Sequence, residues 1–294
     1  MRITQEMMAN NLSRNLSQNT EKLMNAQSIV SSGKKITKAS DDPVGMSNIL
    51  DYRKTLESVD QYSRNISQAN TGLNLADSTL SDIEALLNQA KQLALAQANG
   101  TTSNDDRQIA AGQVQQIRDQ IVQLANTKQG NQYLFGGRKT GSPPYDPNHP
   151  ETGFQGDDGQ NQVVIGDGVT LDTHVSGKQA FAGATDPVVA LTNLIQGLNA
   201  NDSSAITSSL DSLDQSMTQV TDTRADVGLT LNHLDATETH LSDLKLNIQA
   251  LLSNTEDANY TQAVTDLTVQ QSAYQSSLAV AAKIVQPSLL DYLK

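Results

Sequence analysis

The chain has 294 residues with no cysteine and no tryptophan, and only 3% of its residues are aromatic. The lack of cysteine excludes disulfides, thiolate catalysis and cysteine-ligated metals, and the scarcity of aromatics argues against a large globular core. The formal net charge is −12, and no basic stripe is interleaved with aromatics, so nucleic-acid binding is not expected. The first residues lack the apolar core of a cleaved signal peptide, and no stretch is long and apolar enough to insert into a membrane.

The N-terminal region predicts two helices joined by a short linker. Apolar residues at helical spacing predict a first helix over 5–31, with Gly33 as its C-terminal cap. A linker follows over 34–40. Asp42 then fits the N-cap of the second helix and Pro43 its first position.

The second helix carries the most regular apolar seam in the chain. Its steps alternate between three and four residues without a break from Val59 to Ala94. A seven-residue repeat of this length predicts coiled-coil-like packing along roughly 50 Å of helix. A comparable seam runs from Ile206 to Leu252, which predicts that the two helices are antiparallel partners.

Between these seams the pattern predicts a third helix and then a change of character. The third helix is expected to begin at Asn104 or Asp105 and to end near Gly130. From about 138 to 185, proline and glycine are frequent, and short β-like runs cover 162–165, 169–171 and 173–175. Asp186 and Pro187 repeat the N-cap and proline arrangement, so helix resumes there.

The predicted fold is therefore mainly α, an elongated antiparallel helical bundle or coiled coil formed by the N- and C-terminal halves, with a small β-rich insert domain in the middle. We expect a terminal coiled-coil assembly domain over 1–50 and 256–294. A helical-bundle body is expected over 51–137 and 186–255, and the insert over 138–185, with Gly136 and Gly137 as the hinge to it.

The apolar stripes at the two ends are weaker than the seams of the body, because polar and small residues occupy several of their positions. Burying a leucine contributes roughly 1.5–3 kcal/mol, while ordering each residue's backbone costs roughly 1–2. We therefore expect about 1–45 and 258–294 to become ordered only on self-association. The residues predicted to form the assembly interface are Leu12, Leu16, Leu23, Val30, Val264, Leu267, Tyr274, Leu278, Val285 and Leu289.

No pattern predicts catalysis or a bound metal or cofactor. His233 and His240 are seven residues apart, roughly 10 Å along a helix, which is too far to chelate one ion. Both are expected on the solvated face. The Asp157–Asp158–Gly159 run lacks the alternating spacing and distal glutamate of a calcium loop. No nucleophile, base and orienting acid recur at a recognisable spacing, so an enzyme is not expected.

Three segments resemble the flagellin-like axial proteins of bacterial flagella. The first is a signature whose residues are Ser32, Gly33, Ser40, Asp41, Asp42 and Pro43. The others are the Leu93–Thr101 run at the end of the long helix and the closing run from Gln271 to Leu293. Within that family, the Ser40–Pro43 form and the Gly130–Gly137 run favour the proteins of the hook–filament junction.

The resemblance implies a secreted, extracellular structural subunit at the hook–filament junction, exported through the flagellar type III apparatus and homo-oligomeric through its terminal helices. It also implies hook-associated protein 1, flagellin and a cytoplasmic export chaperone as partners. Two alternatives stay open: a short flagellin that forms the filament itself, and a secreted coiled-coil adhesin with the insert as its binding face.

Overall fold

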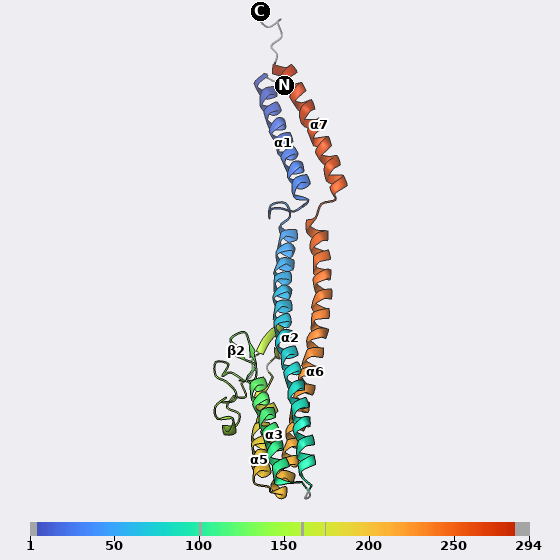
Figure 1. Ribbon diagram of the computed structural model, residues 1–294. Helices are drawn as coiled ribbons and strands as arrows, with labels where there is room; N and C mark the ends of the chain where they lie inside the picture. The colour runs from blue at the N-terminus through green and yellow to red at the C-terminus, as the bar shows by residue number, and fades with distance from the viewer. Residues whose placement is uncertain (1–4, 100–101, 160–161, 174, 286–294) are drawn as a thin grey trace, which may run out of the picture. The chain divides into compact units, whose positions relative to one another are not determined.

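The computed structural model describes residues 5–99, 102–159, 162–173 and 175–285, and divides the chain into two compact units. We call residues 1–58 with 244–294 the terminal unit, and residues 59–243 the central unit. Two long helices, α2 (Pro43–Gln97) and α6 (Ser203–Glu256), contribute residues to both units (Figure 1). The predicted mainly α fold is confirmed, whereas the three-part division of the chain stays a prediction.

In the central unit, α2 and α6 lie side by side and antiparallel, as their seams predict. The Arg224 guanidinium on α6 pairs with Asp77 at 3.1 Å and with Glu84 at 2.6 Å on α2. Lys91, further along α2, pairs at 2.5 Å with Asp214, earlier on α6. The seam from Val59 to Ala94 is buried except for the half-buried Tyr62. Apolar burial along the seam therefore holds the pair together, and the ion pairs fix its register.

Two shorter helices, α3 (Asn104–Ala125) and α5 (Pro187–Asn199), pack on each other and complete the helical part of this unit. Both begin where the sequence predicts: α3 begins at Asn104, and the Asp186 carboxylate caps α5 with Pro187 in its first turn. The cap of α3 is the Ser103 side chain. The buried Arg107 on α3 links the turn after α2 to the turn at the start of α6. Its guanidinium donates to the carbonyls of Asn99 and Asn201 and to the Ser203 hydroxyl.

Helix α3 ends at Ala125, five residues before the predicted end near Gly130. The intervening residues form an antiparallel hairpin of β1 (Lys128–Gln129) and β2 (Gln132–Tyr133). Gly130 lies at φ +63, a conformation that a tight hairpin turn favours and that glycine adopts readily. The glycine thus marks the tip of a turn and not the end of the helix.

The insert is small and built around aromatic side chains. Phe135 and Phe181 meet edge-on at 5.2 Å between ring centroids, and Tyr145 and Phe154 contact the same cluster. A second antiparallel hairpin, β3 (Gln162–Gly166) with β4 (Val169–Asp172), confirms two of the three expected strands. The third is wrong, because Thr173 and Val175 lie outside any strand. A short 3-10 turn, Pro150–Thr152, and α4 (Gly177–Phe181) complete this region.

In the terminal unit, α1 (Gln5–Ser32) packs against α7 (Tyr260–Val285). The two helices run antiparallel (Figure 1). Gly33 follows α1 at φ +71 and its N–H donates to the Ile29 carbonyl at 2.8 Å, which confirms it as the C-terminal cap. The Asp42 carboxylate accepts from the N–H groups of Val44 and Gly45 at the start of α2. This N-cap was also predicted from the sequence.

Candidate assembly interface

The contact between α1 and α7 is a thin seam. Among the described residues of these two helices, only Ala26 and Ala263 are buried. A polar contact also crosses the seam, where the Asn19 amide donates to the Ser277 hydroxyl at 2.6 Å. A seam of small and polar residues buries little apolar surface, so the pair gains far less from burial than the seam of the central unit does.

The predicted interface residues on α1 lie along this seam. The side chains of Leu12, Leu16, Leu23 and Val30 are all half-buried. Their 3/4 spacing therefore places them on the face that meets α7. Each keeps part of its apolar surface exposed, which another helix could cover.

On α7 the predicted residues divide between two faces. Leu267 and Tyr274 are half-buried against α1, whereas Val264 is 39% exposed and Leu278 42% exposed. At these two positions α7 turns away from α1, and Ala263, Gln270 and Ser277 take the places nearer α1. The role of all these residues in an interface between copies stays a prediction. Val285 is the last residue of α7, and its side chain and Leu289 lie outside the described residues.

In the terminal unit, the signature segment between α1 and α2 contacts the link between α6 and α7. The Lys35 N–H donates to the Glu256 carbonyl, and the Ala258 N–H donates to the Gly33 carbonyl, both at 2.8 Å. The Glu256 carboxylate, whose side chain is 6% exposed, pairs at 2.5 Å with both Lys34 and Arg53. We call this set of contacts the linker clasp. It holds the α1–α2 link against the α6–α7 link.

Other signature residues shape the turn into α2. The Asp41 carboxylate accepts from the N–H groups of Thr37 and Lys38 at 3.1 and 3.0 Å, and these two bonds lower the pKa of Asp41. The Ser32 hydroxyl accepts from the Lys34 N–H at 3.2 Å. Ser40 and Pro43 are exposed. The signature is therefore mainly a set of backbone turns and caps.

The two glycines predicted as a hinge form a tight buried turn. The Gly136 carbonyl accepts from the N–H groups of Lys139 and Asp157 at 3.2 and 3.3 Å. Gly137 lies at φ +70 against Asp157, where a side chain would collide with that residue's backbone. The Asp157 carboxylate accepts from the Arg138 N–H, and this bond and one from Gly159 lower its pKa.

Sequence reasoning missed the linker clasp. Glu256 is separated from Lys34 and Arg53 by about two hundred positions, and its local sequence is that of an ordinary helix end. Its burial is the only mark that distinguishes it from other acidic residues, and burial becomes visible only in the fold. A lysine pair directly after the Gly33 cap was the one local hint.

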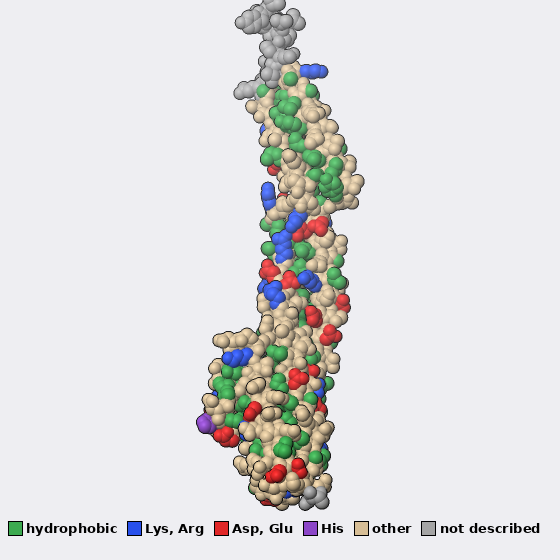
Figure 2. Space-filling model, in the orientation of Figure 1, with side chains coloured by type: hydrophobic (Ala, Val, Ile, Leu, Met, Phe, Trp, Pro, Cys, Tyr) green, Lys and Arg blue, Asp and Glu red, His purple; other side chains and the backbone are tan. Residues whose placement is uncertain are grey.

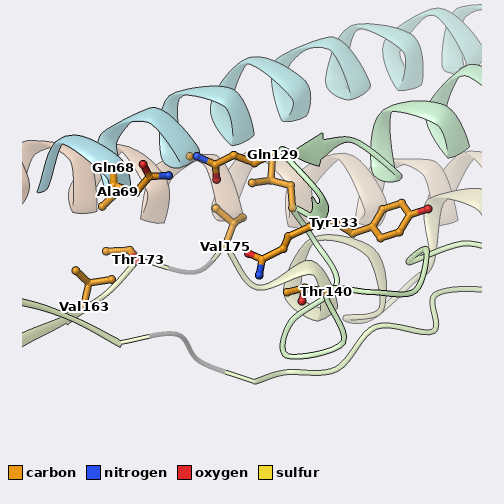
Figure 3. Close-up of a pocket in the computed structure, with 11 residues that line it drawn as sticks. Gln68, Ala69, Gln129, Tyr133, Thr140, Val163, Thr173 and Val175 are labelled. Carbon is orange, nitrogen blue, oxygen red and sulfur yellow. The ribbon is translucent and has the colours of Figure 1, made fainter. Parts of the chain in front are cut away.

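The central unit contains a pocket between α2 and the two hairpins (Figure 3). Its volume is about 230 Å³, and it is lined by Gln, Thr, Val and other uncharged side chains. Gln68 and Ala69 come from α2, while Val163 and Thr173 come from the side of β3 and β4. The lining offers no carboxylate, imidazole or amine, so it has no group suited to general acid–base catalysis at neutral pH.

Titratable side chains elsewhere in the described part of the chain do not assemble into a metal centre. Within the described ranges, no three His, Cys, Asp or Glu side chains are grouped to hold an ion. His233 and His240 are both exposed, as predicted. No α-helix in the described part of the chain has the length and apolarity to cross a bilayer.

Comparison with known proteins identifies the family. The chain is 28% identical to flagellar hook-associated protein 3 of Salmonella typhimurium over 94% of this chain and 95% of that protein. It is 25% identical to the flagellar filament 41 kDa core protein of Borreliella burgdorferi over 94% of each chain. The crystal structure of Bacillus cereus FlgL superposes with a TM-score of 0.60 at 22% identity, covering 69% of this chain and 99% of that one.

Two family models account for both ends of the chain. Residues 3–140 match the bacterial flagellin N-terminal helical region, and residues 210–293 match the bacterial flagellin C-terminal helical region. These are the segments that form the paired helices α1 with α7 and α2 with α6. The chain therefore belongs to the bacterial flagellin family.

Proposed function

We propose that this chain is a structural subunit of the bacterial flagellum that joins the hook to the filament. The observation that carries the proposal is its 28% identity to a flagellar hook-associated protein 3 over almost the full length of both chains. Similarity of that extent includes the insert and the central unit as well as the helical ends.

The geometry of the terminal unit supports a role in assembly. The α1–α7 seam buries only two small side chains among its described residues, and several large apolar side chains remain exposed beside it. Such a surface is stabilised further when other helices cover it. The predicted interface residues, from Leu12 to Leu289, are proposed to make these contacts with neighbouring subunits.

In this role the subunit performs no catalysis and needs no cofactor. We propose hook-associated protein 1 as its partner on the hook side and flagellin on the filament side. An export chaperone is proposed to hold the C-terminal helix before export through the type III apparatus. The mature protein would then reside outside the cell, at the hook–filament junction.

Deleting the gene tests this proposal. The expected result is motility loss with intact hooks and with flagellin shed into the medium, because filaments have no junction to grow from. Expression of the wild-type chain in the same strain should restore attached filaments. Normal filaments in the deletion strain would refute a junction role.

A second candidate is a flagellin that forms the filament itself. It is favoured by the 25% identity to a flagellar filament core protein over 94% of each chain. The two candidates differ in self-assembly. A flagellin should grow long filaments from purified protein, whereas a junction subunit should stop at short assemblies. Electron microscopy of the purified chain under polymerising conditions separates them.

A further inference from the structure

One flank of the α1–α7 pair is hollowed into a groove of about 420 Å³. We call it the α1–α7 groove. Its apolar lining comes from Ala26 and Ile29 on the α1 side and from Ala258 and Ala263 on the α7 side. Three of these four side chains are alanine, so the groove has room for a large side chain from another helix.

The same pair also exposes large apolar side chains, many of them visible in Figure 2 as green surface along its length. Met24 is 64% exposed and Tyr260 65% exposed, beside Val264 and Leu278. Helical residues advance by about 100° each, so Tyr260, Val264 and Leu278 lie within about 40° of one another. We call Met24, Tyr260, Val264 and Leu278 the apolar ridge.

The groove and the ridge lie on opposite flanks of the seam. On α7, Gln262 and Asp266 line the groove on one side of the face that meets α1, and Tyr260 and Val264 lie on the other side. On α1, Asn25 lines the groove, whereas Met24 projects on the opposite side of the seam leucines. Because the helices are antiparallel, the positions on α1 and those on α7 place the groove on the same flank of the pair and the ridge on the opposite flank.

The groove and the ridge also lie at the same level along the pair. The Ala258 N–H bonds the Gly33 carbonyl at one end, and Asn19 bonds Ser277 nearer the other. This register places Met24 between the levels of Tyr260 and Ser277. A second copy displaced sideways would therefore present its ridge to the groove of the first.

We propose that the apolar ridge of one copy of this chain occupies the α1–α7 groove of the next copy. This inference rests on the proposed function and names the partner of its assembly surface. A contact between two different patches of the same chain is heterologous, and repeated contacts of that kind build a ring or an open helical array. Large ridge side chains filling an alanine-lined groove would bury apolar surface that each copy leaves exposed.

Charge at the edges of the two surfaces fits the same arrangement. Lys22 and Lys35 stand on the groove rim with Asp266, which leaves the rim with a positive excess. The exposed Asp257 comes shortly before Tyr260 in the sequence, and Tyr260 is the first ridge residue on α7. The backbones of Lys34 and Asp257 pair as an isolated antiparallel β-bridge within one copy, so Lys35 lies close to the level of Asp257. A sideways neighbour would bring Asp257 toward the Lys35 end of the groove.

The cysteine-free sequence allows a direct test by cross-linking. The full-length chain carrying Tyr260→Cys with Asn25→Cys is assembled in flagella of the deletion strain and treated with a short bis-maleimide. The expected result on a denaturing gel is a ladder of covalent dimers and higher oligomers. Each single variant should stay monomeric, because only a ridge–groove contact brings the two positions together.

The matched control is Tyr260→Cys with Glu21→Cys. Glu21 is exposed one helical turn from Asn25, on the face of α1 turned away from α7. A ladder from this control equal to that of the test pair would overturn the proposal, as would dimers from Tyr260→Cys alone, which indicate a symmetric contact. Met24→Cys with Gln262→Cys supplies a second ridge–groove pair if the first does not assemble.

The outcomes also separate this inference from the proposed function. If a variant restores attached filaments but gives no ladder, the ridge–groove contact is refuted and the junction role stands. If the wild-type chain itself does not restore attached filaments, the junction role fails instead.

Discussion

At the scale of single residues, the buried Glu256 carboxylate and the half-buried Asp186 carboxylate each join separate segments of the chain. Glu256 joins the two links of the terminal unit through Lys34 and Arg53. Asp186 joins the insert to α5, accepting from the Tyr145 hydroxyl and the Phe154 N–H, both at 2.9 Å, as well as from the first turn of α5. Each makes bonds that a neutral substitute cannot fully replace.

We expect Glu256→Gln to loosen the linker clasp. The amide keeps the shape of the side chain but loses both ion pairs, and its NH₂ group is a poor neighbour for two cations. Because Lys34 and Arg53 are 41% and 46% exposed, solvent screens their charges and the expected cost is about 1 kcal/mol or slightly more. Limited proteolysis of the two links should accelerate, whereas Glu57→Gln, an exposed change on α2, should leave it unaltered.

Asp186→Asn is expected to destabilise the central unit by about 1–3 kcal/mol at neutral pH, because the new NH₂ group faces a donor at Phe154. Burial raises the pKa of Asp186 above its ordinary value of 3.8, so the folded protein takes up this proton before the unfolded chain does. Its contribution to stability therefore increases as the pH falls through the raised pKa. Urea unfolding should show the wild-type advantage widening on acidification toward pH 4; a constant gap would contradict this.

At the scale of helices and strands, strong seams and weak seams have different roles. In the central unit the α2 seam is almost entirely leucine, isoleucine, valine and alanine, buried within one copy. The facing stripe of α6 alternates buried leucine, isoleucine and valine with Ser209, Ser216 and Thr223. The α1–α7 seam is interrupted by Asn19, Gln270 and Ser277. A helix pair of this kind gains most of its stability from tertiary contacts and not from propensity.

The expectation that the ends become ordered on assembly stays a prediction, and hydrogen exchange measures it. In dilute monomer, amides of 5–32 and 260–285 should exchange much faster than those of the buried α2 seam, because few apolar contacts oppose local opening. In assembled flagella the same amides should be protected. Equal protection of both helices in the monomer and in the assembly would contradict the prediction.

Helix positions could be predicted because caps and apolar period are local signals. Gly33, Asp42 and Asp186 each perform the capping role that the sequence assigns. The face of α7 that meets α1 could not be predicted in this way, since apolar residues occupy two faces of α7. Only the contact with α1 decides which of the two faces is the inner one. The linker clasp and the α1–α7 groove depend on contacts between distant positions, which no local pattern encodes.

At the scale of the whole molecule, charge is distributed unequally between the units. The central unit holds 9 basic and 22 acidic residues, a net charge of −13, while the terminal unit holds 11 and 10. Copies packed side by side would bring the acidic units near one another, and this repulsion is screened by salt. Assembly of the purified chain should therefore accelerate as salt rises from about 10 mM to 150 mM, measured by light scattering. Slower assembly would indicate that attraction between charges dominates.

Removing the ends should separate folding from assembly. Of the largest fully buried side chains, all but Ile49 belong to the central unit, among them Phe135, Leu87 and Leu191. Each contributes roughly 1.5–3 kcal/mol through burial. A variant lacking residues 1–30 and 260–294 should therefore retain a cooperative unfolding transition close to that of the full chain, seen by circular dichroism. It should remain monomeric in analytical ultracentrifugation where the full chain associates. Loss of the transition would show that the ends hold the stabilising contacts. Association of the truncated chain would show that the assembly interface lies in the central unit.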